Sequence, residues 1–161
     1  MCLEFIVRRT SYKLLVNYQM IEIVNRQRKI KIDAEIFRDF ADKTVSLIPE
    51  ASGKSVVIAF VSDSKMRQLN AEFRGKDLTT DVLSFPFEAD EFETDQNTLG
   101  DVAISLEQAY RQAIENDLTF PTEIKQLILH GILHLCGYDH ETDNGEMNSL
   151  ELKLRDKLLI G

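Results

Sequence analysis

The sequence contains no long apolar segment, since no run of about 18 apolar residues occurs anywhere in the chain. A membrane-spanning helix is therefore not predicted. Cysteine is scarce as well: Cys2 and Cys136 lie far apart, and the chain shows no convincing secretory signal. This usage excludes a disulfide scaffold and predicts a reducing compartment, the cytoplasm by default.

Basic charge is also in short supply, because 27 acidic residues face 19 lysines and arginines and leave a net charge of -8. Part of the acidity is concentrated in residues 88–95, which predict a solvated loop. Tight binding to nucleic acid of any sequence draws on clustered basic residues that displace counterions. A general nucleic-acid coat protein is thereby excluded, but an enzyme that touches only a few phosphates is not.

The chain lacks a linker rich in proline, glycine or serine, and it lacks an internal repeat. Its 161 residues, 43% of them hydrophobic, suit one domain with a real core. Residues 1–19 differ from the rest, with Arg8, Arg9 and Lys13 against a single Glu4. We predict a disordered or loosely attached extension over residues 1–19 and one domain over residues 20–161.

Hydrophobic patterns predict an α+β domain with a mixed sheet packed with helices. The segment 55–61 (SVVIAFV) is apolar on both faces, which predicts a central strand covered on two sides. Ile36 and Ile114 are expected among the core contacts of their helices. Strands are predicted at 20–25, 55–61, 81–85 and 99–104, and helices at 33–48, 63–73, 105–116, 121–135 and after 144.

All three histidines fall within eleven residues, HGILHLCGYDH, at positions 130, 134 and 140. On a helix, His130 and His134 lie about 6 Å apart along the axis and about 40° apart around it. Gly137 permits a tight turn, after which His140 can fold back toward the same ion. Three imidazoles and a fourth position open to water, whose pKa zinc lowers to about 7, are typical of a catalytic site. Zinc is predicted, and nickel, copper or iron also suit imidazole ligands.

Residues around the histidines carry separate predictions. Cys136 is expected to be a small buried hydrophobe rather than a thiolate ligand. Asp139 could bond a ligand imidazole or cap the turn, and the sequence leaves both roles open. Gly131 costs a helix about 1 kcal/mol relative to alanine, which indicates close packing or space for substrate. It also replaces the catalytic glutamate of His-Glu-x-x-His metalloproteases, which argues against proteolysis.

Three further blocks stand out beside the histidine segment: 69–77 (LNAEFRGKD), 80–86 (TDVLSFP) and 99–105 (LGDVAIS). Together with the histidine segment, they resemble the YbeY family of bacterial endoribonucleases. The resemblance extends from about residue 20 to the C-terminus, with Thr79 standing where the family usually has proline. It implies a zincin-like fold and a role in ribosomal RNA maturation and ribosome quality control.

The resemblance also implies a divalent metal ion on His130, His134 and His140, and a functional Arg74. We expect catalytic roles for Arg74 and His130, with Arg74 and Lys76 contacting the substrate. The expected partners are single-stranded RNA, ribosomal RNA in particular, and the ribosome or its proteins. Neither DNA nor a membrane is expected.

Two other functions stay open from the residues. One is a different metal-dependent hydrolase, including a peptidase that takes its general base from Asp139 or Glu141. The other is a non-catalytic ribosome-assembly factor in which the metal braces the helix and the loop after it.

Overall fold

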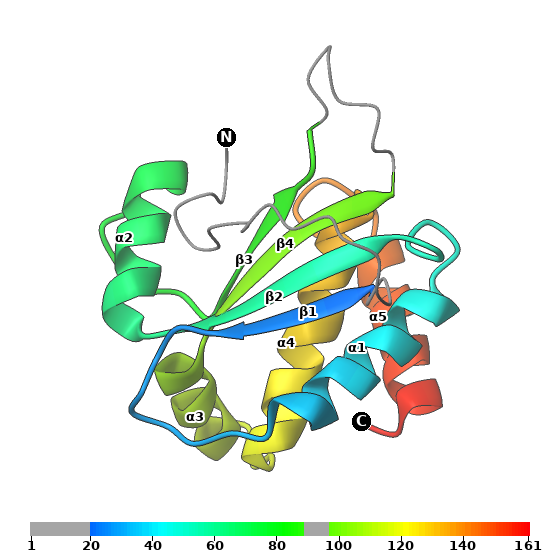
Figure 1. Cartoon of the computed structure of the whole chain (residues 1–161). Coiled ribbons are helices and arrows are strands. Elements are labelled where there is room, and N and C mark those ends of the chain that lie inside the picture. Colours follow the sequence, from blue (N-terminus) through cyan, green and yellow to red (C-terminus); the bar gives the residue numbers. More distant parts are fainter. Residues whose placement is uncertain (1–19, 89–96) are drawn as a thin grey trace, which may run out of the picture.

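The computed structural model describes residues 20–88 and 97–161, which contain a four-stranded mixed sheet (Figure 1). The strand order is β1-β2-β4-β3, with β1, β2 and β4 parallel and β3 antiparallel to β4 at one edge. The predicted α+β fold with a mixed sheet is confirmed. The strands are β1 (Ile21–Asn25), β2 (Ser55–Val61), β3 (Val82–Pro86) and β4 (Thr98–Ser105).

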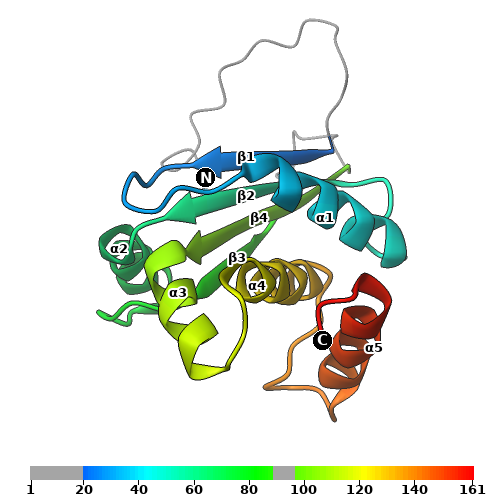
Figure 2. The ribbon, with the colours of Figure 1, turned by 90° about the horizontal axis from the view of Figure 1, so that it is seen from below.

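Helices cover both faces of this sheet. On one face α4 packs against β3 and β4, α1 packs against β1 and α4, and α5 packs against α4 (Figure 2). On the other face α2 (Asp63–Arg74) packs over the carboxyl half of the sheet. The helices on the face opposite α2 are α1 (Ala34–Leu47), α3 (Leu106–Glu115), α4 (Phe120–Leu135) and α5 (Glu146–Leu158).

Strand β2 is buried on both sides, as its continuous apolar pattern predicts. Val56, Ile58 and Phe60 point into the main core beneath α1 and α4. Ala59 and Val61 join Leu69 of α2 in a smaller core on the opposite face. Because its two faces are both apolar, β2 packs against the helices on each side of the sheet.

Helix α4 carries the first two histidines, and its ends are fixed by local chemistry. Thr119 caps the start by accepting a hydrogen bond from the Thr122 backbone N–H at 3.3 Å, and Pro121 occupies the first turn. At the other end Gly137 adopts a φ of +91°, a left-handed conformation that glycine adopts without a steric penalty. The predicted end of this helix at residue 135 and the predicted turn at Gly137 are both confirmed.

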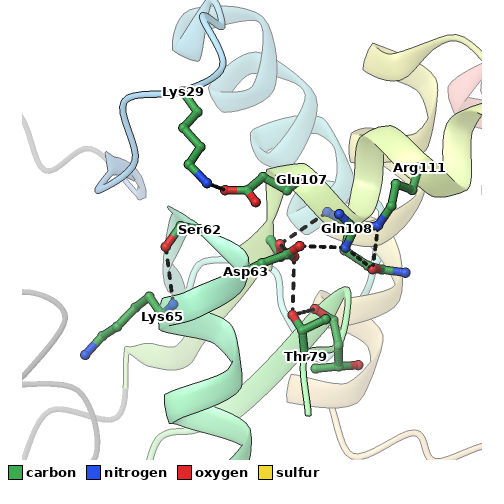
Figure 3. Close-up of polar contacts among 10 residues, drawn as sticks. Lys29, Ser62, Asp63, Lys65, Thr79, Glu107, Gln108 and Arg111 are labelled. Carbon is green, nitrogen blue, oxygen red and sulfur yellow. Dashed lines mark hydrogen bonds and ion pairs between the residues drawn. The ribbon is translucent and has the colours of Figure 1, made fainter.

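A polar network ties the starts of α2 and α3 to the carboxyl edge of the sheet (Figure 3). Asp63 accepts hydrogen bonds from Ser105 Oγ and Arg111 Nη2, both at 2.6 Å, and from Thr79 Oγ1 at 3.3 Å. Burial alone would raise the pKa of Asp63, but the hydrogen bonds from Ser105 and Arg111 outweigh it and lower the pKa. The network fixes the starts of two helices that leave this edge for opposite faces.

Two sequence-based expectations about the core are wrong. Ile36 is 49% exposed and Ile114 is 68% exposed, so neither helix buries these side chains. Each lies at the border of its helix's apolar stripe, where a shift of one position around the helix exchanges core for solvent. The predicted extension 1–19 and most of the acidic segment, 89–96, lie outside the described residues.

Within residues 20–88 and 97–161, no helix combines the length and the apolar character that crossing a membrane requires.

Candidate metal centre

The three histidines converge at the end of α4. His130 and His134 lie on the helix, one turn apart, and His140 lies in the turn that follows. Their ring centroids are separated by 4.7, 5.5 and 5.3 Å, and one potential ligand nitrogen from each lies within 4.8 Å of the others. The convergence that the spacing predicts is thus confirmed.

The nitrogen spacing fits a metal ion. His130 Nε2 and His134 Nε2 are 3.1 Å apart. Two nitrogens bound at about 2.0–2.1 Å to a tetrahedral ion are separated by about 3.3 Å, so these two rings need almost no movement to share one. His140 is exposed on the turn, and its potential ligand nitrogen lies within 4.8 Å of the other two. The set offers three imidazole nitrogens to one ion.

The turn after α4 directs His140 back toward the helix. The Gly137 N–H donates to the His134 carbonyl at 3.0 Å, and the Tyr138 N–H donates to the Leu133 carbonyl at 3.2 Å. Asp139 Oδ1 accepts the Glu141 N–H at 3.0 Å. Of the two roles that the sequence left open for Asp139, capping the turn is therefore the one with a hydrogen bond in the described residues.

A buried carboxylate from another helix contacts the site. Glu151 of α5 is 7% exposed, and its Oε2 lies 3.0 Å from His130 Nδ1. Its other oxygen, Oε1, accepts a hydrogen bond from Arg155 Nε at 3.1 Å. Sequence analysis did not identify Glu151. The available signal was an acidic residue on the apolar face of α5, between Met147 and Leu154.

Local electrostatics keep the site in a form that can bind a cation. Burial lowers the pKa of His134, and the neighbouring His130 and His140 lower it further. The neutral imidazole, which is the form that binds metal, is favoured as a result. Burial alone would raise the pKa of Glu151, but hydrogen bonds from His130 and Arg155 outweigh it and lower the pKa. Glu151 is accordingly a carboxylate at neutral pH.

Gly131 faces the sheet. A Cβ placed there would lie 2.6 Å from Val102 Cγ1 and 3.3 Å from Ser84 Oγ. Ser84 Oγ also donates to the Gly131 carbonyl at 3.0 Å. Close packing therefore explains this glycine, and a glutamate at this position would be directed at β3 and β4, where Val102 leaves it no room.

Cys136 is half-buried rather than buried, and it contacts the core as a hydrophobe, as predicted. It packs against the main core as a free cysteine, and it lies outside the group of side chains that could hold a metal ion. Burial raises the pKa of its thiol to about 11, so the thiolate form that binds metal is scarce at neutral pH.

Arg74 and Lys76 do not belong to the histidine helix or to the turn after it. Arg74 ends α2, Lys76 follows in the next loop, and both are exposed. The ring of Phe73, just before Arg74, contacts Phe85 on the α2 side of β3, with ring centroids 5.0 Å apart. Ser84, between two α2-facing residues of the same strand, instead bonds to α4. Edge strand β3 therefore stands between Arg74 and the histidine helix, and no hydrogen bond or ion pair joins them within the described residues.

Comparison with known proteins identifies the family. A family model described as endoribonuclease YbeY matches residues 22–159. The chain belongs to the YbeY family. A YbeY relative from Thermodesulfovibrio yellowstonii is 35% identical over 152 residues, covering 86% of this chain and 94% of that protein. Another, from Carboxydothermus hydrogenoformans, is 41% identical over 143 residues, covering 86% and 97%. Both relatives are named endoribonuclease YbeY.

A solved structure has a similar fold to this YbeY chain. The solution structure of TM1509 from Thermotoga maritima matches with a TM-score of 0.59 and 30% sequence identity. The match covers 86% of this chain and 88% of that one. The similarity in fold therefore extends over most of the chain.

Proposed function

We propose that the protein is a metal-dependent endoribonuclease that cleaves single-stranded RNA during ribosomal RNA maturation and ribosome quality control. The observation that carries the proposal is the convergence of His130, His134 and His140 in a chain of the YbeY family. The names of the relatives support RNA as the substrate.

The proposed cofactor is one divalent ion, zinc in preference to nickel, copper or iron, held by His130, His134 and His140. Three imidazole nitrogens with neutral rings suit each of these metals. When bound, the ion supplies a Lewis acid for a phosphoryl oxygen of the scissile phosphodiester. The helix and the turn supply the geometry, because they hold the rings close before any ligand arrives.

Arg74 and Lys76 are proposed to bind the RNA backbone. A guanidinium can grip two phosphate oxygens and stabilise charge that grows during cleavage, whereas the Lys76 ammonium acts as a point charge that helps to position the strand. Because β3 lies between Arg74 and the histidines, one RNA strand touching both must pass over the sheet edge at β3. A flexible single strand can follow such a path more readily than a duplex.

The net charge of -8 gives little long-range attraction to RNA. We therefore propose that the ribosome or a ribosomal protein brings the enzyme to its substrate, and that it works in the cytoplasm. DNA is not a proposed substrate. Residues 20–161 are proposed to fold as the catalytic domain, with 1–19 as an extension.

The test compares cleavage of a single-stranded RNA with cleavage of the same sequence in a duplex. We expect the single strand to be cut, and cleavage to stop with a chelator or with Arg74→Ala or His130→Ala. Arg67→Ala is a matched control, because Arg67 lies on the same helix as Arg74 but is bound by Asp77 through two hydrogen bonds of 2.7 and 2.9 Å. Cleavage that persists in both Arg74→Ala and His130→Ala would refute the proposal.

Product ends identify the nucleophile: a cyclic phosphate implicates the ribose 2′-hydroxyl, and its absence implicates water. A cellular assay separates catalysis from binding. If a histidine variant with no cleavage activity still restored ribosomal RNA processing, the protein would be a non-catalytic assembly factor instead.

A further inference from the structure

Glu151 contacts the candidate metal centre from a different helix. We infer that Glu151 is a positioning residue: it holds the His130 ring with its proton on Nδ1, so that Nε2 offers its lone pair to the ion, and Arg155 holds Glu151 in place. The inference rests on the proposed metal site and adds to it residues of α5, outside the histidine segment.

The two nitrogens of the His130 ring have different neighbours. Nδ1 lies 3.0 Å from Glu151 Oε2, whereas Nε2 lies 3.1 Å from His134 Nε2. A neutral imidazole carries one proton, and a carboxylate can only accept it. The proton therefore belongs on Nδ1, and the lone pair on Nε2 faces the other histidines. A hydrogen bond of this kind also makes a metal-ligating imidazole more basic.

Burial makes this contact directional. The Glu151 side chain is 9% exposed, so water has little access to its carboxylate. Both carboxylate oxygens contact protein groups instead, His130 and Arg155. Arg155 lies one turn later on α5 and neutralises its charge. Met147 and Leu154, at 1% and 3% exposure, anchor α5 in the core on either side of Glu151. The carboxylate thus has a fixed place from which to orient His130.

A contact that only ties α5 to α4 would contribute to stability without setting the state of the His130 ring. The two roles separate when metal affinity and ring tautomer are measured beside stability. Glu151→Leu removes the acceptor and puts an apolar side chain of similar size in its place. Removing one partner of a buried ion pair leaves the other charge unpaired and usually destabilises the fold, so the stability of each variant is measured beside its zinc affinity. Glu151→Gln keeps an oxygen acceptor but adds an amide donor that can also bond to the opposite tautomer.

The matched control is Asp156→Asn. Asp156 is exposed and lies on the same helix as Glu151. Its substitution by asparagine removes one negative charge, as the Glu151 substitutions do. All variants are first compared with the wild type by circular dichroism and thermal unfolding of the metal-free protein. Zinc affinity is then measured by competition with a chromophoric chelator. We expect zinc binding to weaken on the order of 10- to 100-fold in Glu151→Leu, less in Glu151→Gln and not at all in Asp156→Asn.

The state of the ring is read directly from long-range proton–nitrogen NMR spectra of the metal-free protein. The chain has only three histidines, so the His130 signals can be assigned with a His130 variant. In the wild type we expect the proton on Nδ1, and in Glu151→Leu we expect this preference to be lost. A wild-type ring protonated on Nε2 would overturn the inference, even if no Glu151 variant folded.

The results also separate this inference from the proposed function. A wild type that binds no zinc would refute the metal site and the role of Glu151 together. A wild type that binds zinc, and a folded Glu151→Leu that binds it equally well, would overturn the role of Glu151 alone and leave the proposed nuclease untouched.

Discussion

Replacing Gly131 by alanine tests how tightly the histidine helix is held against the sheet. The new Cβ would lie 2.6 Å from Val102 Cγ1 and 3.1 Å from Cγ2. Carbon atoms in favourable contact are about 3.5–4.0 Å apart, so the overlap is about 1 Å. Val102 is fully buried in β4, and a β-branched side chain has few rotamers to escape into. Either α4 or β4 must therefore move.

The net effect is a balance of two terms. Alanine in place of glycine favours the helix by about 1 kcal/mol, whereas overpacking a core costs about 1–3 kcal/mol. Because the overlap involves a rigid buried side chain, the cost belongs in the upper part of its range. We expect Gly131→Ala to lower the free energy of unfolding by about 1–2 kcal/mol. In a chain of this length the Tm should fall by about 2–8 °C.

Urea unfolding of Gly131→Ala, Val102→Ala and the double variant measures the overlap itself. Val102→Ala removes both methyl groups that the new Cβ meets, so the double variant should be more stable than the sum of the single effects predicts. We expect a favourable coupling of about 1–2 kcal/mol. Gly131→Ala should also weaken zinc binding, because the displaced backbone carries His130 and His134. A Gly131→Ala protein as stable as the wild type, with no coupling, would refute the packing argument.

Three further predictions concern single ionisable groups. Asp63→Asn should lower the free energy of unfolding at pH 7 by about 1–3 kcal/mol. The difference between variant and wild type should shrink below about pH 4, because the pKa of Asp63 is lower in the folded state and its stabilisation is lost as it takes up a proton. Urea unfolding at several pH values measures the size of the effect and its pH dependence. In a Cys2→Ser background, alkylation of Cys136 by iodoacetamide at pH 8 should be on the order of 100-fold slower in the native protein than in urea, since its pKa is about 11 when folded; equal rates would contradict its burial. The metal-free protein should lose stability as pH falls below about 6.5, because the folded state lowers the pKa of His134 and the unfolded chain gains the proton first; His134→Gln should flatten that slope, and an unchanged slope would contradict the shift.

The elements that sequence reasoning located are those whose signals are local. The apolar run of β2 and the turn at Gly137 after α4 act over a few residues, and both interpretations are confirmed. The metal-ligand spacing of His130 and His134 is equally local, because one helical turn sets it. The expectations for Ile36 and Ile114 were wrong because the edge of an apolar stripe depends on how the helix is rotated against its neighbours.

Glu151 shows where a reading of local patterns stops. It lies 21 residues beyond His130 on a separate helix, and only the packing of α5 against α4 brings the two side chains together. Its pattern did hold a signal, since an acidic residue between Met147 and Leu154 on a buried face needs a partner with a positive charge or a proton to donate. The sequence pattern therefore predicts that Glu151 has a partner but does not identify the partner residue. Arg155 is available one turn away, but the second partner, His130, follows from the fold alone.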